Sequence, residues 1–380
     1  MRVLMVTPGY YPIRGGTETI VESLSIQLNK QGVSTDVLTL NMDRKWEPKH
    51  YAKQEVINGV NVIRVPAFNY FPRLWVSPQA VFNINVFPIK FQKFLKGYDV
   101  IHFHEVELSF PFFSLVINKP KILQAHELHF GRFRRYGITK AIYNHVADLY
   151  LAIGEQVKSE FIELGIPENK IKQFPNSVDP TLFYPRGGKL KDTLLYVGRI
   201  IPSKGLHVLL KALDYLKRPV HLVVIGAPQG KDSYFINVMK MVDAVNNTGK
   251  HRVTYLGNIN EKDLVEWYSK ASLFVFPSVF EPFGIVLLEA LASGTPVVST
   301  RSGGISDVVR DNENALLIPE RNNPMDLAEA VEYLLEHDDV RIRFGLNGRS
   351  WVCRNYSLSV AANKLEKIYE ELLALKKGLQ

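Results

Sequence analysis

The chain has 380 residues, 46% of them apolar, and a formal net charge of +8 at pH 7. This length and apolar content suffice to bury a large core and favour two domains over one. No stretch approaches 18 uninterrupted apolar residues, which excludes a membrane-spanning helix. The single cysteine, Cys353, excludes a disulfide framework and a cysteine-built zinc site. The positive charge favours anionic partners such as phosphates, nucleotides or an anionic membrane surface.

Short β-branched apolar runs alternate with helical patterns, which is typical of parallel α/β folds. In the first half the predicted strands are Val3–Thr7, Thr35–Leu40, Val60–Pro66, Val100–His104, Lys121–His126 and Leu149–Gly154. Apolar residues at helical spacing before a glycine predict an amphipathic helix over residues 17–32. The opening residues indicate a buried strand and lack the features of a secretory leader. Together with the lone cysteine, this favours a cytoplasmic protein.

The second half repeats the alternation. Its predicted strands are Thr193–Gly198, Val220–Gly226, Arg252–Gly257, Ser272–Pro277 and Thr295–Thr300. Prolines and a glycine pair between Pro175 and Asp192 interrupt both periodicities, which predicts a domain boundary there. We therefore expect a first domain over residues 1–184, a second over 185–356, and an amphipathic C-terminal helix within 357–380.

One loop with a glycine pair and one loop with two cations each follow a predicted strand. In open parallel sheets, ligands bind at the loops that follow the strands. Gly15 and Gly16 stand at the start of the first helix, where bare amides and the helix dipole favour an anion; an ordinary turn is the alternative. In "YVGRIIPSKG", Arg199 and Lys204 share one loop and could hold a diphosphate without metal. Two solvated loop cations are the alternative there.

The stretch "EPFGIVLLEALASGTPVVST" carries two glutamates, Glu281 and Glu289. On one helix they would lie about 12 Å apart along the axis, too far for a glycoside hydrolase pair. We expect Pro282 to start the helix, with Glu281 in the preceding loop and Glu289 two turns inside. Glu289 is then either a ligand for hydroxyl groups or a core residue satisfied by a basic or hydroxyl neighbour.

The chain resembles the retaining glycosyltransferases of family 4. The resemblance covers nearly the whole sequence and rests on four segments in order: "FPNSVDPTLF", "YVGRIIPSKG", the Glu-x7-Glu segment from Glu281 to Glu289, and "RSGGISDVV". It implies the GT-B fold, in which two Rossmann-like domains with parallel sheets face each other across a cleft. It also implies that the C-terminal helix crosses back to the first domain.

The resemblance also implies a role for each matching residue. Arg199 and Lys204 would bind the donor diphosphate, Glu289 the ribose hydroxyls, and Glu281 the hydroxyls of the transferred sugar. Backbone amides of Phe283, Gly284 and Ile285 would contact sugar and phosphate, with Gly15 and Gly16 closing over the phosphates. The loop containing Gly257, Asn258 and Ile259 would border the base.

Histidines follow two strands of the first half. The resemblance places His126 near the anomeric carbon, on the acceptor side, whereas a lone histidine in this position is more often structural. His102 and His104 are interpreted as architectural. The sequence indicates no metal site, because no carboxylates stand at ligand spacing, and no cofactor is expected.

The acceptor side is defined more weakly. Residues 67–96 are rich in aromatic side chains with interspersed cations, and Arg132, Arg134 and Arg135 add a basic cluster. Both suit an anionic membrane or a lipid-linked phosphate acceptor, and solvated loops over a buried aromatic core are the alternative. The protein would then be peripheral at the inner face of the membrane.

The resemblance implies that the protein is a retaining transferase, and the lack of any Asp-x-Asp motif favours metal independence. The protein would move a hexose or N-acetylhexosamine from a UDP- or GDP-linked donor to a hydroxyl of a glycan or lipid-linked acceptor. Front-face attack is favoured over a covalent intermediate, because no carboxylate stands as a clear nucleophile. The alternatives are a noncatalytic nucleotide- or carbohydrate-binding protein and a sugar-nucleotide epimerase. Nucleic acid is not an expected partner, because no recognisable module is present.

Overall fold

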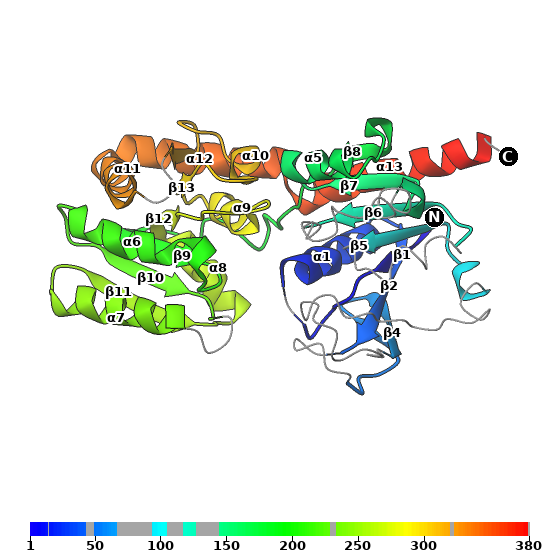
Figure 1. Ribbon diagram of the computed structural model, residues 1–380, viewed down its shortest axis with the longest axis horizontal. Coiled ribbons are helices and arrows are strands. Elements are labelled where there is room, and N and C mark those ends of the chain that lie inside the picture. The colour runs from blue at the N-terminus through cyan, green and yellow to red at the C-terminus, as the bar shows by residue number, and fades with distance from the viewer. Residues whose placement is uncertain are drawn as a thin grey trace. The chain divides into compact units, whose positions relative to one another are not determined.

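The computed structural model describes residues 1–13, 15–42, 49–66, 93–104, 117–126, 144–228, 233–319 and 323–378. The chain divides into two compact units (Figure 1). Unit 1 consists of Met1–Asn176 and Leu358–Gln380, and unit 2 consists of Ser177–Ser357. The predicted boundary lay at residue 184, whereas this division falls between Asn176 and Ser177.

Unit 1 is built on an eight-stranded sheet with the order β3-β4-β2-β1-β5-β6-β7-β8. The strands are β1 (Arg2–Val6), β2 (Ser34–Asn41), β3 (Gln54–Ile57), β4 (Val60–Pro66), β5 (Val100–His104), β6 (Lys121–Ala125), β7 (Leu149–Ala152) and β8 (Ile171–Gln173). All neighbours pair in parallel except the edge strand β3, which is antiparallel to β4. In β1, Val3, Leu4 and Met5 are wholly buried, as expected for a strand covered on both faces.

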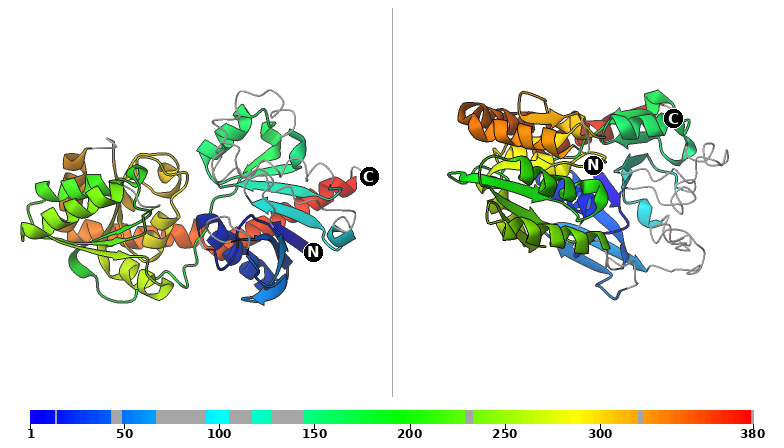
Figure 2. Two further views of the ribbon diagram at one scale, coloured as in Figure 1. Left: turned by 60° about the horizontal axis from the view of Figure 1, so that its bottom comes forward. Right: turned by 60° about the vertical axis from the view of Figure 1, so that its left-hand side comes forward.

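The helices of unit 1 in the described ranges are α1 (Gly16–Lys30), α5 (Glu155–Glu163) and the C-terminal α13 (Leu358–Gly378), with a short 3-10 turn, η2 (Glu168–Lys170). Helix α13 contacts α1, so the predicted return of the C-terminal helix to the first domain is confirmed (Figure 2). The hydroxyl of Tyr369 on α13 lies 2.8 Å from Nδ1 of His102 on β5. Helix α13 therefore forms part of the core of unit 1, together with α1 and β5.

Unit 2 is built on a six-stranded parallel sheet with the order β11-β10-β9-β12-β13-β14. The strands are β9 (Leu190–Val197), β10 (His221–Ile225), β11 (Arg252–Gly257), β12 (Ala271–Phe276), β13 (Val297–Thr300) and β14 (Ala315–Ile318). The chain runs outward from β9 through β10 to β11, then returns to β12 and continues in the opposite direction. The strand order therefore reverses between β9 and β12.

The helices of unit 2 are α6 (Leu206–Ala212), α7 (Ser233–Asn247), α8 (Glu261–Lys270), α9 (Ile285–Ala292), α10 (Ile305–Val308), α11 (Pro324–Glu336) and α12 (Asp338–Asn355), with short 3-10 turns η3 (Pro202–Lys204) and η4 (Leu213–Tyr215). Helix α6 contacts α7 and α11, whereas α9 contacts α8, α10 and α12. Right-handed crossovers place α6 and α7 on one face of the sheet and α8 and α9 on the other.

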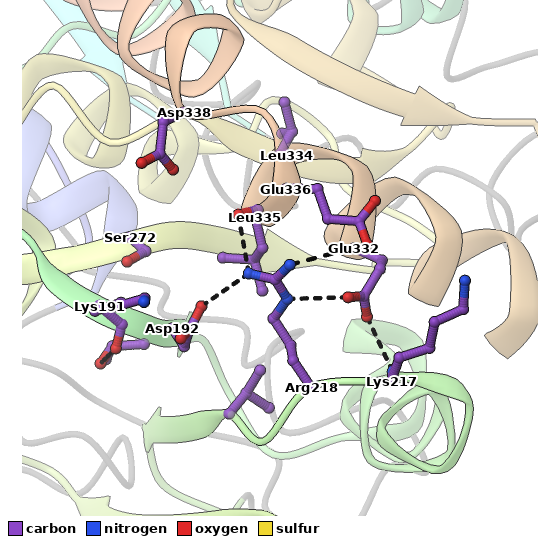
Figure 3. Close-up of polar contacts among 12 residues, drawn as sticks. Lys191, Asp192, Lys217, Arg218, Ser272, Glu332, Leu334, Leu335, Glu336 and Asp338 are labelled. Atoms are coloured by element: carbon purple, nitrogen blue, oxygen red, sulfur yellow. Dashed lines mark hydrogen bonds and ion pairs between the residues drawn. The ribbon is translucent and has the colours of Figure 1, made fainter.

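An ion-pair cluster around Arg218 joins the amino ends of the strands to α11 (Figure 3). The guanidinium donates to Glu332 at 2.9 Å, to Asp192 at 3.4 Å and to the carbonyl oxygen of Leu335 at 3.0 Å. The Arg218 side chain is 27% exposed and that of Glu332 is 13% exposed, so water screens these contacts only in part. The cluster stabilises unit 2 at the end of the sheet opposite to the carboxyl ends of its strands.

Three short strands, β3, β8 and β14, are not among the predicted ones. Each has only three or four residues, which is too short for an alternating pattern to stand out from loop sequence. The other strands agree with the prediction in type and place.

Candidate active site

The loops that follow β9 and β12 lie where the strand order of unit 2 reverses. In open parallel sheets, ligands bind beyond the carboxyl ends of the strands at such a point. The first loop carries Arg199 and Lys204, and the second carries Glu281. The topology therefore brings these predicted residues, which are far apart in sequence, to one edge of one sheet.

Backbone contacts hold the two loops together. The amide of Val279 donates to the carbonyl oxygen of Ser203 at 2.8 Å, and the hydroxyl of Ser278 donates to the same oxygen at 3.1 Å. Gly205 has a φ of 71°, and a Cβ added there would lie 1.8 Å from the carbonyl oxygen of Pro277. Only glycine permits this approach, so Gly205 is required for the loops to meet.

Lys204 and Glu281 form an ion pair between these loops. The ammonium donates to Oε2 of Glu281 at 2.8 Å and to the carbonyl oxygen of Phe280 at 3.0 Å. The Lys204 residue is 7% exposed, whereas Arg199 on the same loop is exposed. A buried cation is thus held in a fixed place beside a carboxylate, and a second cation lies at the surface.

The helix after Glu281 begins later than the sequence predicts. Pro282 was expected to start it, but α9 begins at Ile285, with Gly284 as its N-cap at φ 93° and ψ 58°. The left-handed conformation of Gly284 ends the turn and directs the chain into the helix. Had Pro282 been the first helical residue, no left-handed residue would have been needed there. Phe283, Gly284 and Ile285 therefore form the helix start, where amides have no partner inside the helix.

Glu289 lies in the second turn of α9 and is partly exposed. The hydroxyl of Tyr268 on α8 donates to its Oε2 at 2.7 Å. Burial raises the pKa of Glu289 to about 7, and the hydrogen bond from Tyr268 opposes that rise. A hydroxyl neighbour of Glu289 was one of the alternatives considered from the sequence, but no local pattern identified Tyr268 as that neighbour.

Loops after the neighbouring strands adjoin the same edge. Gly226, after β10, has a φ of 145°, and a Cβ there would lie 1.9 Å from the carbonyl oxygen of Gly198. Its amide donates to the carbonyl oxygen of Gly257, which precedes Asn258 and Ile259. After β13, the amide of Gly304 donates to the carbonyl oxygen of Glu281 at 2.8 Å. The loops after four of the six strands, together with the carboxyl end of β11, are therefore linked by backbone contacts.

In unit 1, Gly15 is the N-cap of α1 and Gly16 its first residue, and both are exposed. A Cβ added to Gly15 would lie 2.4 Å from Oε2 of Glu18, so that carboxylate folds back over the helix start. An acidic residue in the first turn suits the positive end of the helix dipole. Glu18 was not singled out from the sequence, although its place in the first turn was a signal.

His126 belongs to a buried histidine cluster in unit 1. It is 7% exposed, and its Nε2 lies 3.2 Å from Nδ1 of His104. The ring of His104 lies 4.2 Å from that of His102. Burial lowers the pKa of His126 to about 4, partly offset by a hydrogen bond with Asn176, and lowers that of His102 to about 3. These imidazoles are therefore neutral at neutral pH.

Some predicted features fall outside the described residues, namely the basic cluster of Arg132, Arg134 and Arg135 and most of the aromatic-rich stretch, residues 67–92. Within the described ranges, no three His, Cys, Asp or Glu side chains are grouped so as to hold a metal ion. No helix in the same ranges is both long and apolar enough to cross a membrane.

Comparison with known proteins gives two adjacent family matches. The family model described as Glycosyltransferase Family 4 matches residues 14–182, and the one described as Glycosyl transferases group 1 matches residues 187–351. The chain is 28% identical to an uncharacterized glycosyltransferase of Methanocaldococcus jannaschii, over 97% of this chain and 98% of the relative. It is 25% identical to the D-inositol 3-phosphate glycosyltransferase of Corynebacterium diphtheriae, over 99% and 96% of the two chains.

Solved structures show the same fold along the whole chain. The sucrose-phosphate synthase of Thermosynechococcus elongatus matches with a TM-score of 0.75 at 21% identity, over 98% of this chain and 99% of that one. HepE of Anabaena, solved in complex with UDP and glucose, matches with a TM-score of 0.76 at 17% identity, over 98% and 100%.

Proposed function

Because this chain belongs to the family-4 glycosyltransferases of group 1 and has the GT-B fold, we propose which donor and acceptor it uses and which residues bind them. The enzyme transfers a sugar from a nucleotide sugar. The proposed donor is a hexose or N-acetylhexosamine linked to UDP or GDP. The proposed acceptor is a hydroxyl of a glycan or of a lipid-linked sugar.

Unit 2 is the proposed donor unit. The observation that carries this proposal is the buried ion pair of Lys204 and Glu281, at the point where the strand order reverses. An anionic diphosphate would meet the ammonium of Lys204 and the guanidinium of Arg199. The amides at the start of α9 would add hydrogen bonds and the positive end of the helix dipole.

The two glutamates receive different hydroxyl groups in this proposal. Glu281 stands beside Lys204 and would accept hydrogen bonds from the transferred sugar, which sits next to the diphosphate. Glu289 lies in the second turn of α9 and would accept from the ribose. The loop of Gly257, Asn258 and Ile259 would border the base through backbone groups.

The proposed chemistry needs no metal ion. A nucleoside diphosphate is a good leaving group, so the protein has to stabilise the negative charge that develops as the bond to the sugar breaks. Lys204, Arg199 and the helix start supply that positive potential. We propose front-face attack with retention of configuration, in which the leaving phosphate oxygen takes the proton of the acceptor hydroxyl.

Unit 1 is the proposed acceptor unit. His126 is proposed to lie on the acceptor side as a neutral residue, since its lowered pKa leaves it able to exchange hydrogen bonds but not to carry charge at neutral pH. Gly15 and Gly16 are proposed to approach the donor phosphates. A peripheral contact with an anionic membrane remains part of the proposal through Arg132, Arg134 and Arg135.

Calorimetric binding of UDP, GDP and ADP, with and without EDTA, tests these assignments. We expect one nucleotide to bind selectively, with the same affinity in EDTA, and Glu289→Ala to weaken that binding. Retained affinity in Glu289→Ala would remove Glu289 from the site. Binding that EDTA abolishes would refute metal independence, and no binding of any nucleotide would refute the donor assignment to unit 2.

A further inference from the structure

Tyr268 is a buried tyrosine that reaches the candidate donor site only through another side chain. It lies in the last turn of α8 and is 0% exposed. Its ring packs against Phe183 and Phe274, with centroids at 5.7 and 5.6 Å. The phenol is therefore held in one orientation by the core, and its hydroxyl points at Oε2 of Glu289 at 2.7 Å.

The backbone of Tyr268 is tied to the same region. The hydroxyl of Thr295, which follows α9, donates to the carbonyl oxygen of Tyr268. The hydroxyl and the carbonyl oxygen of Tyr268 are thus both hydrogen-bonded to residues between Glu289 and Thr295. Motion of α8 relative to α9 would break two hydrogen bonds at once.

The two oxygens of Glu289 differ in their surroundings. Oε2 accepts from Tyr268, whereas Oε1 makes no hydrogen bond with any of the residues that the structure describes. The residue is partly exposed, so Oε1 is the oxygen that remains for a ligand. A glutamate side chain without such a partner would lose rotamer freedom when it is ordered by a ligand.

We propose that Tyr268 is a positioning residue of the donor site, which fixes the Glu289 carboxylate so that Oε1 meets the ribose hydroxyls of the nucleotide. This inference rests on the proposed function, since it takes Glu289 as the ribose ligand. Tyr268 itself touches no substrate. It acts by preparing an acceptor before the nucleotide arrives.

The surroundings of Glu289 make this role measurable. On α8, Tyr268 donates to the carboxylate and favours its ionised form, while the charge of Glu261 disfavours it. On α12, Arg349 is directed to the carbonyl oxygens of Phe183 and Ala292. On α10, Asp307 acts on Tyr356, and β13 has no charged residue. Among the described groups, Tyr268 is therefore the one that favours the ionised form of Glu289 against the effect of burial.

The test is the pH profile of nucleotide affinity in Tyr268→Phe, with UDP as the probe. Loss of the hydroxyl raises the pKa of Glu289 further, so less of the carboxylate is ionised at pH 7. We expect the affinity for UDP to fall on the order of tenfold at pH 7, as expected for the loss of one hydrogen bond to a charged group. The affinity should recover by pH 9. In the wild type, the corresponding fall occurs at lower pH.

Three controls isolate the effect. The phosphate of UDP itself titrates near pH 6. Each affinity profile is therefore divided by the profile of Glu289→Gln, in which UDP still titrates but position 289 cannot ionise. Tyr98→Phe removes a similar bond, from a tyrosine hydroxyl to Asp36 at 2.6 Å, in unit 1 and should leave UDP affinity unchanged. Carbon-13 NMR titration of Glu289 without nucleotide reports its pKa directly in wild type and Tyr268→Phe.

The outcomes separate the two proposals. If Glu289→Gln binds UDP as the wild type does at every pH, the ribose assignment fails whatever Tyr268 does. If Glu289→Gln binds weakly but Tyr268→Phe matches the wild type, the positioning role is refuted and the ribose assignment stands. A loss in Tyr268→Phe that is equal at all pH values, with an unchanged Glu289 titration, would assign Tyr268 to core packing alone and overturn the inference.

Discussion

Replacing Gly205 by alanine should separate the two loops that carry Lys204 and Glu281. At φ 71° any residue with a Cβ is strained by about 1–2 kcal/mol. The added Cβ would also lie 1.8 Å from the carbonyl oxygen of Pro277. Because that atom is backbone, no side-chain rotation relieves the clash, and forced repacking adds about 1–3 kcal/mol. Unit 2 should therefore lose about 2–5 kcal/mol of stability.

Gly249→Ala is the matched control. Gly249 has a φ of 70°, but a Cβ added there would meet nothing within 4 Å. It should cost only the backbone strain of about 1–2 kcal/mol. The difference between the two variants measures the close approach of the loops after β9 and β12, separately from the left-handed conformation.

Hydrogen exchange of peptides from β9 and β12 in increasing urea gives the stability of unit 2, and calorimetry gives its affinity for UDP. Gly205→Ala should lose both, whereas Gly249→Ala should keep its UDP affinity. Equal losses of stability in the two variants would refute the inference that the contact with Pro277 requires glycine. Full UDP affinity in a destabilised Gly205→Ala would show that binding does not depend on the paired loops.

Three further predictions concern Arg218, Lys204 and His102. Arg218→Met should lower the unfolding free energy of unit 2 by about 1–3 kcal/mol in urea at low salt, because it leaves Glu332 without its charge partner. It should not change the affinity for UDP. No loss of stability at low salt would show that solvent screens the cluster completely. Lys204→Met should weaken UDP binding at least about tenfold in calorimetry, as loss of a charged contact predicts, and unchanged affinity would remove Lys204 from the donor site. The stability of unit 1 should fall as the pH drops from about 6.5 toward 4. In this range His102 of the unfolded chain takes up a proton, whereas His102 in the folded core, with its pKa lowered to about 3, does not. His102→Gln should flatten this fall in pH-dependent urea unfolding, and an unchanged slope would contradict the buried neutral state.

The sequence allowed prediction of the alternation of strands and helices because each element carries its own local pattern. It also placed Arg199, Lys204, Glu281 and Glu289 in loops or helices that follow strands. Their mutual geometry was not predictable, since it depends on which strands are neighbours. The 2.8 Å ion pair of Lys204 and Glu281 exists because β12 returns beside β9, which no local pattern states.

Partners from distant segments were likewise hidden. Tyr268 meets Glu289 only after β12 and a loop have brought α8 against α9. Tyr369 meets His102 across nearly the whole sequence. The start of α9 was misplaced because the preference of proline for the first helical turn was weighed without the left-handed turn at Gly284.

The two segments of unit 1 lie on either side of unit 2 in the sequence, whereas unit 2 is one continuous stretch. During synthesis from the N-terminus, unit 2 has all of its residues before α13 leaves the ribosome. The core of unit 1 is complete only once α13 has been made, a helix of 21 residues in which Leu365 and Tyr369 are wholly buried. A nascent chain that stalls before Leu358 therefore exposes the apolar surface of unit 1, not that of unit 2, and it is the unit made first that chaperones would have to protect.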